Sequence, residues 1–87
     1  MSTDKKKAVA LKYEKNKDLA PKVVAKGSGE IAERILEVAK QHGVYIKEDP
    51  TLVEVLSGLE LYEEIPEDLY KVIAEILVLI YQAKQKR

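Results

Sequence analysis

Short apolar segments separated by polar ones predict three strands. Residues 8–13 (AVALKY) and 22–26 (KVVAK) are apolar and partly β-branched, with charged or turn-forming residues on both sides. Residues 44–47 (VYIK) alternate apolar and polar side chains after a glycine. We therefore expect a strand at each of these three places, with the polar, proline-ended segment 14–21 as a connection.

A different spacing between the second and third strands predicts an amphipathic helix. Ile31, Ile35, Val38 and Ala39 recur at intervals of three and four, with Ala32 and Leu36 flanking them, so this face is expected to be buried. The Ser28 hydroxyl is the expected cap at the helix start. Gly43 is the expected end, because glycine readily adopts the left-handed conformation found after helices.

Two more helices are predicted in the C-terminal half of the chain. Asp49 and Pro50 begin a short helix through Ser57, and Pro66 begins the longest one, through about Lys84. The buried face of the long helix is expected to comprise six apolar residues: Leu69, Val72, Ile73, Ile76, Leu77 and Ile80.

This order predicts an α/β fold, β-β-α-β-α-α, with a small mixed sheet of about three strands packed with about three helices. The helical crossover between the second and third strands favours at least one parallel pairing. With 87 residues the chain has room for one core, so residues 8–87 are predicted to form a single domain preceded by a basic arm, residues 1–7.

Charge is balanced overall but uneven along the chain. Residues 1–26 hold eight lysines and three acids, whereas residues 27–87 hold seven bases and twelve acids. Such a chain can have a solvated basic arm beside an acidic body, contact itself, pair with a second copy or bind an acidic partner. The absence of cysteine, of a secretion leader and of a long apolar segment predicts a cytoplasmic protein without membrane insertion.

Candidate catalytic groups are few. His42 falls at a predicted helix end, where hydrogen bonding explains it, and no nucleophile, base and orienting partner are recognisable together. The Gly27-Ser28-Gly29 segment is interpreted as a tight turn rather than an anion cradle. Acids near Glu63 suit a loop and a helix start better than a metal site. We expect no enzyme activity, cofactor, metal or nucleic-acid binding.

Three segments in register resemble one known family. They are AVALKY, then APKVVAKGSGEIAERI with AKQHGVYIKED, and IPEDLYKVIAEILVLIY. From Ala8 to about Tyr81 the chain is similar to the C-terminal cytoplasmic domain of the flagellar export switch protein family, FlhB, and its type III secretion counterparts. The resemblance implies a chain that begins where the family's cleaved C-terminal fragment begins, with three strands where the family domain has four.

The resemblance also concerns self-cleavage. Family members cut themselves at an Asn-Pro-Thr-His turn just before the first of these strands. Here the corresponding positions are Thr3, Asp4, Lys5 and Lys6. None of the motif is present, so self-cleavage is not expected.

The implied role is a non-enzymatic binding module of the export apparatus that stands in for, or competes with, the cleaved fragment in substrate-specificity switching. Implied partners are the N-terminal part of the switch protein, the length-control protein and export substrates. The expected binding surface is the first strand's edge with the lysines before it: Lys5, Lys6, Lys7, Ala8, Val9, Ala10, Leu11, Lys12 and Tyr13. The alternative is a self-associating protein, a homodimer whose open sheet edge is closed by a second copy.

Overall fold

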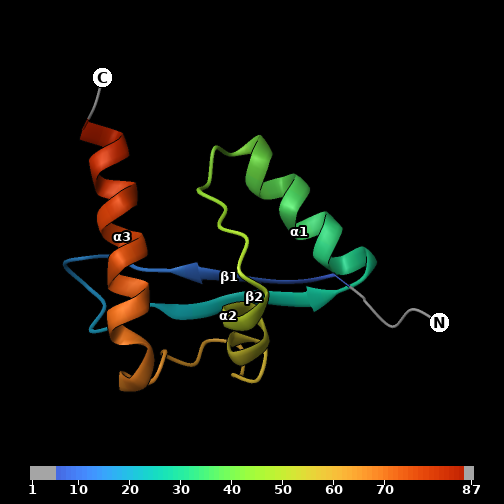
Figure 1. Cartoon of the computed structure of the whole chain (residues 1–87), viewed down its shortest axis with the longest axis horizontal. Helices are drawn as coiled ribbons and strands as arrows, with labels where there is room; N and C mark the ends of the chain where they lie inside the picture. Colours follow the sequence, from blue (N-terminus) through green and yellow to red (C-terminus); the bar gives the residue numbers. More distant parts are fainter. Residues whose placement is uncertain (1–5, 86–87) are drawn as a thin grey trace.

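The computed structural model describes residues 6–85, with side chains for residues 6–82 (Figure 1). A hairpin of two strands is followed by a helix on each face of the sheet and by a long C-terminal helix. The elements are β1 (Lys7–Lys12), β2 (Lys22–Ser28), α1 (Glu30–Gln41), α2 (Pro50–Leu56), the 3-10 turn η1 (Glu67–Leu69) and α3 (Tyr70–Gln85).

The sheet consists of β1 and β2 in antiparallel register. Ala8 pairs with Gly27 and Ala10 with Ala25, after which a bulge shifts the register. The expected parallel pairing is therefore wrong, since within the described residues the two strands are joined only as a hairpin.

The predicted third strand at residues 44–47 is also wrong. This segment carries no regular secondary structure, and it connects α1 on one face to α2 on the other (Figure 1). A segment with strand-forming side chains becomes a strand only where a neighbouring strand can exchange backbone hydrogen bonds with it. Residues 44–47 form no ladder or bridge with a strand in the part of the chain that the structure describes, so the sheet is one strand smaller than expected, while the α/β class is confirmed.

The face of the sheet beneath α1 is lined by small residues. Gly27 lies so close to this helix that a Cβ added to it would come within 2.8 Å of Ile31 Cβ. Ala8, its partner across the sheet, is buried on the same face. The helix start differs from expectation, because Gly29 occupies the cap position with φ 64° and Ser28 ends β2.

The buried face of α1 is rotated from the predicted one. Ala32 is fully buried, whereas Ile31 is 61% and Val38 42% exposed. Gly27 lets α1 approach the sheet so closely that the small Ala32 is fully buried, while Ile31 lies over Gly27 with its Cγ2 methyl and leaves the rest of its side chain exposed. The predicted helix end is confirmed, with Gly43 at φ 68°.

The main apolar core lies on the opposite face. Its buried members are Ala20, Leu56, Ile65 and Ile73. Half-buried apolar residues of β1, of the helices and of the segment after α2 pack against it: Val9, Leu11, Leu52, Leu59, Leu69, Val72, Ile76 and Leu77. The predicted inner face of α3 is thus confirmed in outline, with Ile80 half-buried near its outer end.

The two helix starts marked by proline behave differently. Asp49 caps α2 as predicted, since its Oδ1 accepts a hydrogen bond from the Leu52 amide at 3.0 Å. Pro66 instead precedes the 3-10 turn η1, and α3 begins only at Tyr70.

Candidate functional site: the free edge of β1

β1 presents one edge that no strand covers within the described residues. Its other edge pairs with β2. The far edge of β2 is occupied at its start: the Val23 amide donates to Glu63 O at 3.0 Å, the Tyr62 amide to Val23 O at 2.6 Å, and the Ile65 amide to Pro21 O at 2.9 Å. The far edge of β2 therefore keeps free backbone groups only beyond this point, at Lys26 and Ser28, whereas the outer edge of β1 is free along the whole strand within the described residues.

The pairing pattern identifies the outward-facing backbone groups. The Gly29 amide donates to Lys6 O at 2.8 Å, so Lys6 faces β2. In an antiparallel ladder the direction of these groups alternates from residue to residue. The amides and carbonyls of Lys7 and Val9 consequently face away from β2, where a partner strand can bind them.

The side chains of the predicted surface differ in accessibility. Lys6, Lys7, Lys12 and Tyr13 are exposed, Ala8 is buried, and Val9, Ala10 and Leu11 are half-buried. Lys5, with the cleavage-motif positions Thr3 and Asp4, lies outside the described residues. Residues 6–13 thus offer a partner mainly backbone groups and the exposed lysine and tyrosine side chains.

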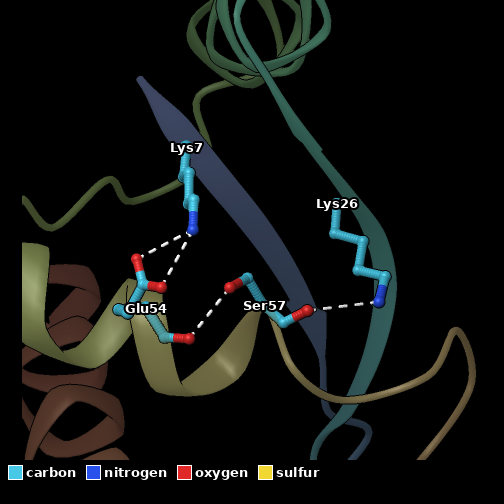
Figure 2. Close-up of polar contacts among 4 residues, drawn as sticks. All are labelled: Lys7, Lys26, Glu54 and Ser57. Atoms are coloured by element: carbon cyan, nitrogen blue, oxygen red, sulfur yellow. Dashed lines mark hydrogen bonds and ion pairs between the residues drawn. The ribbon is translucent and has the colours of Figure 1, made fainter. Parts of the chain in front are cut away.

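Two of the β1 lysines already face carboxylates of the same chain. Lys7 Nζ lies 2.8 and 3.0 Å from the two Glu54 carboxylate oxygens (Figure 2). Lys12 Nζ lies 3.3 Å from Glu14 Oε2. An acidic partner would have to compete with Glu54 for Lys7, so the positive charge of this edge is partly neutralised.

Sequence reasoning missed the residue that holds α2 beneath the sheet. Lys26 Nζ donates to Ser57 O at 3.2 Å, and Ser57 Oγ donates to Glu54 O at 2.8 Å (Figure 2). Lys26 Nζ also donates to Leu59 O at 2.5 Å. Lysine often interacts with the last carbonyls of a helix, but nothing in the sequence indicates that a lysine on β2 reaches this one. Together with Lys7 it fixes α2 next to the free edge.

No catalytic or metal-binding constellation occurs in this region. His42 is exposed at the end of α1. Among the described residues, no three histidine or acidic side chains are grouped so as to hold a metal.

The hollow next to Lys7, lined also by Gly27, Ser28 and Ser57, measures about 250 Å³. Residues 6–85 likewise contain no helix long and apolar enough to span a membrane.

These features define a small α/β domain in which the outer edge of β1 is free of other strands among the described residues. The chain belongs to the FlhB HrpN YscU SpaS family, whose model matches residues 5–80. The resemblance to the flagellar and type III export switch family is therefore confirmed.

Individual relatives agree with this assignment. YlqH of Bacillus subtilis is 49% identical over 77 residues, which make up 88% of this chain and 83% of YlqH. The flagellar biosynthetic protein FlhB of the same organism is 42% identical over 80 residues, 91% of this chain but 22% of FlhB. The cytoplasmic domain of FlhB from Shewanella putrefaciens superimposes with a TM-score of 0.82 at 35% identity, over 87% of this chain and 64% of that one.

Proposed function

We propose that this protein is a non-enzymatic binding module of the flagellar or type III export apparatus, acting in the cytoplasm. It binds an extended segment of the export switch protein along the free edge of β1, and so stands in for or competes with that protein's C-terminal fragment. Family membership and similarity to FlhB support the export role. The free β1 edge is the observation that supports the binding mode.

The physical basis is strand addition. Lys7 and Val9 present unpaired backbone groups, and each main-chain hydrogen bond to a partner satisfies groups on both chains. Recognition by backbone explains how one edge can accept segments of different sequence. Exposed lysines on β1 disfavour indiscriminate pairing with other edges.

Charge adds selectivity to this mode. Lys6 is exposed, whereas Lys7 is shared with Glu54. An acidic segment is thus attracted chiefly by lysines not engaged within the chain, and its binding weakens as salt rises.

The test is a calorimetric titration with a synthetic peptide that spans the host switch protein's segment up to its Asn-Pro cut. Hydrogen exchange should show new protection at Lys7 and Val9 on binding. The control is the same peptide N-methylated at every second residue, namely at the residues whose amides would donate to β1. Equal binding of both peptides, or none of either, would contradict strand addition.

Partners of other kinds remain predictions from the resemblance: the length-control protein and export substrates. The alternative role, a homodimer closed edge to edge, predicts that Lys7 and Val9 amides are already protected without peptide. Hydrogen exchange of the free protein, compared at about 10 µM and about 1 mM, distinguishes the two, because edge-to-edge pairing of two copies adds protection at Lys7 and Val9 as the protein concentration rises.

A further inference from the structure

α1 carries an apolar row that the sheet covers only in part, since Ile31 lies next to Gly27 but remains 61% exposed. Ile31, Ile35 and Val38 lie on one line of the helix, since residues three and four apart are neighbours on its surface. Ile31 and Val38 are exposed and Ile35 is half-buried. A two-stranded sheet is only about 10 Å wide, roughly one helix diameter, so it cannot cover a broad apolar face.

The charges beside this row have a definite order. Glu30, Arg34 and Glu37 follow each other along one margin, spaced by four and three residues, so they too form a line. All three are exposed, and none takes part in an ion pair among the described residues. Their charges are therefore available to a molecule that covers the apolar row.

The order of these charges along α1 is complementary to the same order on a second helix that runs in the opposite direction. When two copies of α1 pack antiparallel about a two-fold axis, Arg34 of each copy faces Glu37 of the other, and Glu30 faces the uncharged Gln41. In a parallel two-fold pair the charged margins of the two copies would lie on opposite sides of the seam, so Arg34 would not meet Glu37. The formal net charge of zero means that whole chains do not repel each other.

We propose that α1 is a self-association surface, in which Ile31, Ile35 and Val38 pack against the same residues of a second copy and Arg34 pairs with the second copy's Glu37. This interface is separate from the β1 edge and independent of the export role. The exposed apolar area is far below the roughly 800 Å² per partner of a standard stable interface. The dimer is therefore weak, with a dissociation constant of about 10 to 1,000 µM.

The test is sedimentation equilibrium of the full chain from about 10 µM to 1 mM, spanning the expected dissociation constants. Wild type should shift from monomer to dimer. Ile31→Glu should raise the dissociation constant at least about tenfold. Each copy would then bury one carboxylate against the apolar row of the other copy. Its matched control is Leu79→Glu on α3, a site 51% exposed, which should leave association unchanged.

A charge exchange distinguishes specific pairing of α1 from nonspecific hydrophobic association. Arg34→Glu should weaken association through repulsion from the second copy's Glu37, and the double variant R34E/E37R should restore it. Circular dichroism verifies that each variant is folded. A monomeric wild type at about 1 mM, loss of association in Leu79→Glu, or failure of the double variant to recover would each overturn the proposal.

Discussion

The close contact between β2 and α1 makes Gly27 sensitive to a single added carbon. In Gly27→Ala the new Cβ would come within 2.8 Å of Ile31 Cβ, with the Ile31 Cγ2 methyl also in its way. Contacts of this length are far inside the carbon–carbon optimum of about 3.5 to 4.0 Å. Ile31 cannot rotate its own Cβ aside, so α1 itself has to shift away from the sheet.

The expected cost follows from overpacking a tight helix–sheet contact. Forcing an extra carbon into a well-packed site costs about 1 to 3 kcal/mol, and replacing glycine by alanine recovers about 0.4 to 1 kcal/mol through the unfolded chain. The net loss should be about 1 to 2 kcal/mol. For a domain of this size each kcal/mol lowers the melting temperature by about 4 to 8 °C.

Thermal unfolding followed by circular dichroism, together with urea denaturation, measures the effect. Gly58→Ala is the matched control, because its added Cβ would lie 3.5 Å from Val55 O, an ordinary contact. Its stability should be unchanged or slightly higher. A Gly27→Ala protein as stable as Gly58→Ala would refute the close approach of α1 to β2.

Three further substitutions test other features of the structure. Lys26→Met keeps the aliphatic stem but removes both bonds to Ser57 O and Leu59 O, so urea denaturation should show a loss of about 1 to 3 kcal/mol. Lys22→Met, which loses only a 3.9 Å contact with Asp18, should change stability less. A double-mutant cycle of Lys7→Met and Glu54→Gln should give a coupling of about 0.2 to 1 kcal/mol that disappears in high salt, because both side chains are exposed; a larger, salt-independent coupling would contradict this. Tyr62 has φ 69° and a side chain 71% exposed, so Tyr62→Asn should raise stability by about 0.5 to 1 kcal/mol by relieving the backbone, and Tyr62→Ala should not.

Much of the local structure was predictable because its causes are local. The hairpin strands, the Asp49 cap, the helix end at Gly43 and the inner face of α3 each depend on side chains within a few residues. The family could also be identified from three segments in register. The sequence correctly predicted the strand β1. It did not predict that Glu54 partly neutralises Lys7 on this strand, since the two residues are 47 positions apart.

The sequence by itself determined the two hairpin strands, the approximate positions of the helices, the uneven charge and the family, because composition, periodicity and caps act over one or two turns of chain. Only the tertiary structure decided which strands pair and which side of α1 is buried. Residues 44–47 have strand-forming side chains but form no backbone ladder with a strand, so they stay outside the sheet. Ala32 is fully buried and Ile31 only partly covered because Gly27 lets the helix approach the sheet closely. Both outcomes depend on distances between segments remote in sequence, and such distances are not encoded in any local pattern.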